Sequence, residues 1–225
     1  MKHLFIAGNW KSKKTAAEAR LWHDDFVVRM KDVLLQSATV VVFPPYTAIA
    51  ELQSLVKTSG IGIALGAQDV SGYGEGAYTG EVTAGMVKEF ASWVLIGHSE
   101  RRKYFGETDE QLQKKVEQAK IAGLGVVYCV PDDVTVVPSG VDVIAYEPVW
   151  AIGTGKTDSP ENANAVVTSI KSKTGVSTVI YGGSVTADNV ASFVNTSAID
   201  GVLPGGASLD PEKFANLILN AIALR

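Results

Sequence analysis

The chain has 225 residues, 46% of them hydrophobic and 20% charged, with a net charge of −4. This composition supports a large core and excludes a disordered chain, and the acidic balance without a basic block argues against nucleic acid as a partner. The single cysteine, Cys129, excludes an internal disulfide and predicts a reducing, cytoplasmic setting. Apolar stretches are too short to span a membrane, so we expect no membrane association.

Short apolar runs rich in β-branched residues recur along the chain. They do not alternate with polar residues, which is typical of strands buried on both faces of a parallel sheet. We predict strands at Leu4–Ala7, Val40–Phe43, Ile61–Leu65, Trp93–Ile96, Val126–Val130, Val143–Tyr146, Thr178–Tyr181 and Gly201–Leu203.

Helical patterns separate most of these runs. Thr15–Leu35 and Asp109–Ala122 have helical periodicity, while Ser159 and Asp210 each precede a proline, as an N-cap does. Alternating strands and helices, with eight strands, predict a single domain over residues 1–225, folded as a closed (β/α)8 barrel. An open, doubly wound sheet is the alternative.

The connection between the fifth and sixth strands is unusually poor in helix-forming residues. Residues 131–140 contain two prolines and four β-branched residues, so we expect the helix here to be missing or reduced. Apolar groups on the outer face of these strands, such as Ile144, are then expected to lack a cover and to favour further association near residues 131–140.

Chemistry-bearing residues follow several of the strands. In a barrel, the segments after the carboxyl ends of the strands line the site, and here they are 8–11 (GNWK), 97–102 (GHSERR), 146–157 (YEPVWAIGTGKT), 181–184 (YGGS) and 203–207 (LPGGA). Glu147 ends a buried strand, where a carboxylate is unusual unless it is paired or functional. Taken singly, Lys11 and His98 are ordinary surface and structural residues. Together with Glu147 and two glycine pairs, they predict a single site that binds a phosphate. This site would contain a base, a neutral hydrogen-bond donor and a cation.

Five of these motifs, in this order, resemble the triosephosphate isomerase family: 7–11 (AGNWK), 96–102 (IGHSERR), 145–156 (AYEPVWAIGTGK), 181–184 (YGGS) and 205–208 (GGAS). The resemblance runs from residue 5 to the C-terminus. It implies a glycolytic and gluconeogenic isomerase, an intramolecular oxidoreductase that interconverts dihydroxyacetone phosphate and D-glyceraldehyde 3-phosphate.

The resemblance also implies a role for each site residue, carried over from the family. Glu147 would move the proton, neutral His98 would donate to the enediolate oxygen, and Lys11, with Asn9 as its polar partner, would supply positive potential. Residues 148–157 would form a closing lid. The phosphate would be held by the backbone amides of Gly153, Ser184, Gly205 and Gly206. No metal or cofactor is expected, because side chains suffice for proton transfer.

The family's subunit contact also has counterparts in this chain. The loop Gly72–Glu81, with Thr79 near its tip, would reach across to a partner in a homodimer, and Glu81 would pair with Arg101 between subunits. Cys129 resembles a buried family cysteine and is interpreted as a packing residue. The chain departs from the family at Pro131 and Asp132, in the reduced helix, and at Pro204, where valine is usual.

Two other functions fit parts of the sequence. A lyase or synthase on a phosphate-binding barrel, using a Schiff-base lysine, would explain Lys11 and the glycine pairs but not the segment led by Glu147. A binding or scaffold protein would explain the reduced helix, but it would not need Asn9, Lys11, His98 and Glu147 together.

Overall fold

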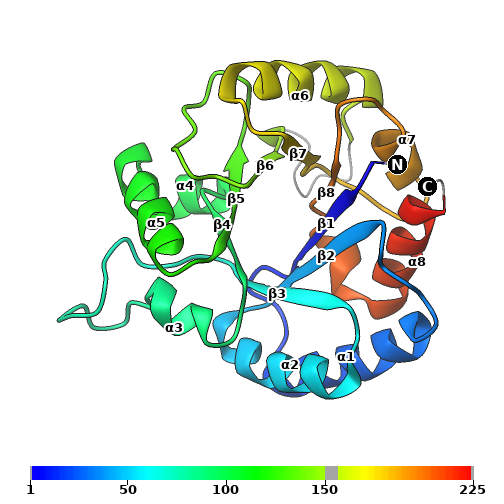
Figure 1. The fold of residues 1–225 in the computed structure, drawn as a ribbon, viewed down its shortest axis with the longest axis horizontal. Coiled ribbons are helices and arrows are strands. Elements are labelled where there is room, and N and C mark those ends of the chain that lie inside the picture. Colours follow the sequence, from blue (N-terminus) through cyan, green and yellow to red (C-terminus); the bar gives the residue numbers. More distant parts are fainter. Residues whose placement is uncertain (1, 150–156, 224–225) are drawn as a thin grey trace.

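The eight predicted strands form a closed parallel barrel. The computed structural model describes residues 2–149 and 157–223, and within them the strands pair in chain order, with β1 also paired to β8 (Figure 1). Every predicted run overlaps a strand. The strands are β1 (Leu4–Asn9), β2 (Ala38–Phe43), β3 (Ile63–Ala67), β4 (Trp93–Ile96), β5 (Gly125–Val130), β6 (Val143–Tyr146), β7 (Thr178–Tyr181) and β8 (Gly201–Val202).

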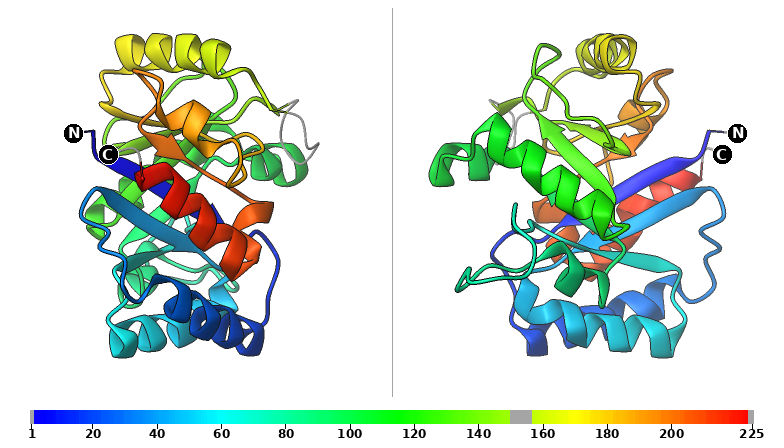
Figure 2. Two further views of the ribbon diagram at one scale, coloured as in Figure 1. Left: turned by 90° about the vertical axis from the view of Figure 1, so that its right-hand side faces the viewer. Right: turned by 60° about the vertical axis from the view of Figure 1, so that its left-hand side comes forward.

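Helices surround this barrel, with α1 and α2 on one side and α6 on the opposite side (Figure 2). The helices are α1 (Ala16–Met30), α2 (Tyr46–Ser59), α3 (Ala84–Lys88), α4 (Ser99–Phe105), α5 (Asp109–Ile121), α6 (Pro160–Thr174), α7 (Val190–Val194) and α8 (Pro211–Ile222), with a short 3-10 turn, η2 (Gly206–Leu209). Among the described residues, none of the helices has the length and apolar composition needed to cross a membrane.

The helix boundaries follow local signals. Ser159 and Asp210 cap α6 and α8 as predicted, since their side chains accept from the backbone N–H of Asn162 and Lys213. The prediction was wrong at the end of α1, which stops at Met30. There the N–H of Val33 turns back to the Met30 carbonyl at 3.0 Å, a three-residue step that ends the α-helical ladder.

Alternate residues of the strands enter two different cores. Ala7 and Ala145 belong to the cluster inside the barrel, whereas Ile6, Ile144 and Tyr146 pack in the layer between barrel and helices. Because side chains of a strand alternate between its faces, residue parity decides which side chains reach the barrel mouth. This explains why the strand sequences are apolar throughout rather than alternating.

The segment that joins β5 to β6 has no helix in residues 131–142, as expected. The expectation that it leaves an apolar face bare was wrong, since Ile144 is fully buried. Val137 and Val141 of the segment pack against the outer core. Two carboxylates fix the segment: Asp133 bonds to Lys173 of α6 at 2.6 Å, and Asp142 accepts from the N–H of Val126 in β5 at 2.8 Å. An irregular but tethered segment thus covers the strands in place of a helix.

Candidate active site

Strand parity aims two of the predicted residues at the mouth of the barrel. Ala7 and Ala145 point inward, so Asn9 and Glu147, two residues further along, lie on the same inner side. Both are buried, with 4% and 2% of their surface exposed. Burial of these polar groups at the carboxyl end of a barrel is the pattern of a functional site rather than of a core.

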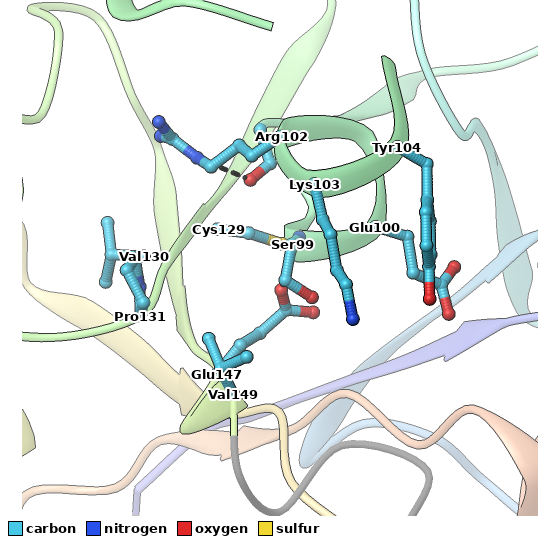
Figure 3. A pocket seen from close by; sticks show the side chains of 11 residues that line it. Ser99, Glu100, Arg102, Lys103, Tyr104, Cys129, Val130, Pro131, Glu147 and Val149 are labelled. Carbon is cyan, nitrogen blue, oxygen red and sulfur yellow. Dashed lines mark hydrogen bonds between the residues drawn. The ribbon is translucent and has the colours of Figure 1, made fainter. Parts of the chain in front are cut away.

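Glu147 is held by two donors from the start of α4. Its Oε1 lies 3.1 Å from Nε2 of His98, and its Oε2 accepts from the backbone N–H of Ser99 at 3.1 Å. Figure 3 shows the carboxylate of Glu147 directed toward Ser99. The contact joins residues 49 positions apart in the chain, His98 and Glu147, through the closure of the barrel.

The tautomer of His98 follows from its position as the N-cap of α4. Its Nδ1 accepts from the backbone N–H of Glu100 at 3.2 Å. A ring nitrogen that accepts carries no proton, so the neutral ring has its proton on Nε2. That N–H points into the site, where it can donate to an oxygen of a ligand.

Lys11 occupies a constrained position between neighbours. Its backbone has a φ of 53°, in the left-handed region, and its N–H donates to Oδ1 of Asn9 at 2.9 Å. Its Nζ pairs with Glu100 at 2.5 Å. Non-glycine residues with such a φ cost energy and concentrate at functional sites, so the backbone and side-chain contacts of Lys11 mark it as a candidate site residue.

One cavity of about 430 Å³ brings the predicted residues together. Its size falls in the range of small-molecule sites. Of the predicted residues, its lining contains Asn9, Lys11, His98, Glu147, Ser184, Gly205 and Gly206. The remaining one, Gly153, lies outside the described residues, as does most of the predicted lid.

Glycine is required directly after β7, beside Glu147. A Cβ at Gly182 would lie 2.8 Å from Cγ of Glu147 and 3.2 Å from the carbonyl oxygen of Tyr146. The backbone just beyond β7 therefore approaches Glu147 more closely than any other residue type allows. The glycine pair of the 181–184 segment thus shapes the wall of the site as well as exposing backbone amides.

A second cavity of about 480 Å³ lies on the other side of Glu147, between α4 and the end of β5 (Figure 3). The thiol of Cys129 borders it and is buried. Burial, and then the nearby charge of Glu147, raise the pKa of this thiol well above its usual value, which keeps it protonated and unreactive. This supports the interpretation of Cys129 as a packing residue.

Sequence reasoning missed the partner of Lys11. Glu100 was part of the 97–102 motif but had no role, although it bonds both Lys11 and, through its N–H, His98. The only available signal was its place in a polar run directly after a buried strand. Its pairing with Lys11, across 89 positions, could not be read from the sequence.

Pro204 lies beyond the ladder of β8, as its chemistry requires. The strand ends at Val202. Pro204 contributes only its carbonyl oxygen, which accepts a hydrogen bond from the N–H of Asn9 at 3.0 Å. Leu203 still donates to the Tyr181 carbonyl at 2.8 Å. Proline therefore removes no donor that the barrel uses.

We expect Pro204→Val to change KM by less than about threefold, which is under about 0.7 kcal/mol. Gly205 and Gly206, the predicted donors, follow the proline and keep their N–H groups in this variant. Steady-state kinetics on purified variant and parent measure the effect. A tenfold shift in KM would show that residue 204 itself takes part in binding.

Fold and site together define an enzyme of the (β/α)8 barrel class with a basic, glycine-lined pocket. The family model of triosephosphate isomerase matches residues 4–142 and 138–221, two segments that overlap in the connection between β5 and β6. The chain belongs to the triosephosphate isomerase family.

Individual relatives agree with the family model. The triosephosphate isomerase of Caldanaerobacter subterraneus subsp. tengcongensis is 41% identical, over 97% of this chain and 99% of the relative. The triosephosphate isomerase of Synechocystis is 42% identical, over 97% of this chain and 98% of the relative. The crystal structure of triosephosphate isomerase from Bartonella henselae superposes with a TM-score of 0.81 at 30% sequence identity. The superposition covers 97% of this chain and 98% of that one.

Proposed function

We propose that the chain interconverts dihydroxyacetone phosphate and D-glyceraldehyde 3-phosphate, with Glu147 as the base that moves the proton between adjacent carbons. Membership of the family carries the activity, as an intramolecular oxidoreductase of glycolysis and gluconeogenesis. The observation that carries the residue roles is the pairing of Glu147 with His98 at 3.1 Å beside Lys11 in one cavity.

The proton transfer uses three side chains. Glu147 removes the proton from the carbon next to the carbonyl, and the carbonyl becomes an enediolate. Nε2–H of His98 donates to the developing oxyanion, and the ammonium of Lys11 stabilises its charge. Glu147 then returns the proton to the neighbouring carbon, while the hydroxyl proton moves from one enediolate oxygen to the other by way of Nε2 of His98. The two transfers together exchange aldehyde and ketone without a net change in oxidation state.

The phosphate group would lie at the opposite wall of the cavity. The backbone amides of Ser184, Gly205 and Gly206 are the proposed donors, together with Gly153 of the closing lid. Gly205 and Gly206 open η2, and Cβ-free residues let an anion approach the backbone. Asn9 supports the site by fixing the backbone of Lys11.

The Schiff-base alternative fits the site less well. A lysine nucleophile is usually activated by desolvation or by a neighbouring cation, whereas Lys11 is partly exposed and bonded to the carboxylate of Glu100. A coupled assay that follows triose phosphate isomerisation tests the proposal directly. Turnover without trapping by borohydride supports it, while trapping on Lys11, or no turnover, would favour the lyase or the scaffold.

We also propose that the single domain over residues 1–225 acts in the cytoplasm as a homodimer. The loop Gly72–Glu81 leaves the barrel between β3 and α3 (Figure 1), and in it Tyr73 stacks on Tyr78 at 4.4 Å although both are about half exposed. An ordered aromatic pair on a projecting loop is typical of a surface that a partner covers. Arg101, the proposed partner of Glu81 across the interface, is anchored within its own chain by Asp69 and Glu107.

Light scattering at micromolar concentration should give the mass of a dimer. Tyr78→Asp places a charge in the proposed interface and should shift the mass toward the monomer, with loss of activity. Val134→Asp, in the exposed part of the β5–β6 segment, is the matched control and should leave the mass unchanged. A stable, fully active monomer of the parent chain would refute the dimer.

A further inference from the structure

A partly buried glutamine beside the site has no role in the mechanism above. Gln68 directly follows β3, and β1, β2 and β3 are neighbours in the barrel (Figure 1). Ala64 of β3 packs against the cluster inside the barrel, so Gln68, four positions further along, is directed to the same inner side. Its side chain can therefore reach the ends of the neighbouring strands.

The side-chain amide of Gln68 joins the ends of β1 and β2. Its Nε2 donates to the carbonyl oxygen of Lys11 at 2.8 Å and to that of Phe43, the last residue of β2, also at 2.8 Å. Both partners are acceptors, and the NH2 group of glutamine supplies the two N–H donors that they need. The Phe43 carbonyl also accepts from the N–H of Trp10 at 3.1 Å. Gln68 thus ties the carbonyl of Lys11 to the point where the β1 segment leaves β2.

The backbone of Lys11 is strained and is held at both of its polar groups. Its φ of 53° lies in the left-handed region, which a residue with a Cβ keeps only where its surroundings over-determine it. The N–H of Lys11 donates to Oδ1 of Asn9 at 2.9 Å, and its carbonyl accepts from Gln68 at 2.8 Å. Two side chains, one for each polar group, therefore maintain this conformation.

Gln68 is itself anchored through the next residue. Asp69 is buried, and its carboxylate pairs with Lys115 of α5 at 2.7 Å and with Arg101 of α4 at 2.9 Å. Because Asp69 shares a peptide bond with Gln68, these ion pairs limit the movement of the glutamine backbone. Contacts therefore run from α4 and α5 through residues 68 and 69 to Lys11.

We propose that Gln68 is a positioning residue for the isomerisation: its two N–H groups hold Lys11 in the left-handed conformation that keeps the ammonium at the cavity. The inference rests on the proposed role of Lys11. Among the described residues, Lys11 lines the cavity of about 430 Å³ and Gln68 does not, so an effect of Gln68 on the reaction passes through Lys11. The positive charge acts on the anionic substrate and on the enediolate, so its displacement raises KM and lowers kcat.

The test is a double-mutant cycle on the full-length protein. Gln68→Met keeps the length of the side chain but removes both donors, and we expect kcat/KM to fall by about tenfold or more. In a Lys11→Gly background, the same substitution should change kcat/KM by less than about twofold, because no ammonium is left to position. Equal losses in the two backgrounds would show a merely structural role. That result, or a kcat/KM of Gln68→Met within about twofold of the parent, would overturn the inference.

Gln68→Glu is a second variant for the same cycle. It keeps the shape of the side chain but places carboxylate acceptors opposite two carbonyl oxygens, so it should lose at least as much activity as Gln68→Met. It takes the place of Gln68→Met in the cycle should that variant fail to fold.

Gln113→Met and Gln113→Glu are the matched controls, because Gln113 is exposed on α5 and donates to Glu117 of the same helix. Both should keep the kcat and KM of the parent. A comparable loss in either control would assign the effect to the type of substitution and overturn the inference.

Failure of this inference is distinguishable from failure of the proposed function. If Lys11→Gly loses activity while Gln68→Met retains it, the role of Lys11 stands and only the positioning role of Gln68 falls. If Lys11→Gly keeps the kcat/KM of the parent, the proposed role of Lys11 is itself wrong, whatever the Gln68 variants do. A parent chain without isomerase turnover would instead refute the proposed function.

Discussion

Glu147→Asp should lower kcat by about 100-fold or more and leave KM nearly unchanged, because the base is withdrawn by about one methylene. In the parent, Glu147 reaches both Nε2 of His98 and the N–H of Ser99 at 3.1 Å. A shorter carboxylate cannot hold this position and also meet the carbon from which it removes the proton. The proposed phosphate donors follow other strands, so we expect substrate affinity to be retained.

Steady-state kinetics in both directions of the reaction measure this effect. Glu110→Asp is the matched control, since Glu110 lies on the exposed face of α5 and, among the described residues, forms its ion pair with Lys114, four positions along the helix. It should behave as the parent. A Glu147→Asp variant with kcat near that of the parent would remove Glu147 from its proposed role.

Gly205→Pro should raise KM by about tenfold or more. One hydrogen bond to a charged group is lost, and such a bond contributes about 1.5–3 kcal/mol. Proline has no N–H to donate to the phosphate. It also adds bulk next to Lys11, because a Cβ at Gly205 would lie 3.3 Å from Cε of that lysine. Both effects weaken the binding of a phosphorylated substrate.

Two alanine variants separate these causes. Gly205→Ala keeps the N–H but adds the Cβ near Lys11, and Gly206→Ala keeps its N–H where nothing lies within 4 Å of the added Cβ. We expect a small rise of KM for the first and almost none for the second. The assignment of Gly205 as a donor fails if inorganic phosphate inhibits Gly205→Pro as strongly as it inhibits the parent.

For the β5–β6 connection, the sequence predicted the local structure but not the packing. Its two prolines and β-branched residues predicted a missing or reduced helix over residues 131–140, and the structure has no helix in residues 131–142. The same reasoning wrongly predicted a bare apolar face at Ile144. Helix propensity depends on local residues. Whether the connecting segment covers the outer face of β5 and β6 depends on distant contacts, such as that of Asp133 with Lys173, 40 positions away.

The barrel and most residues of its candidate site could be predicted from the sequence. Three local patterns carried these predictions: continuous apolar runs, capping residues before prolines, and polar motifs after the strands. Each can be recognised from residues that are adjacent in the sequence. Strand parity then places Asn9 and Glu147 inside the barrel mouth.

The contacts that hold these residues in place are visible only in the folded barrel. The bonds of Lys11 to Glu100, of Glu147 to His98, and of Asp158 to Tyr181 of β7 join distant parts of the chain. Each depends on closure of the sheet, which brings strand ends together at one mouth. Since such contacts are set by the geometry of the closed barrel and not by residue preference, no local pattern in the sequence specifies them.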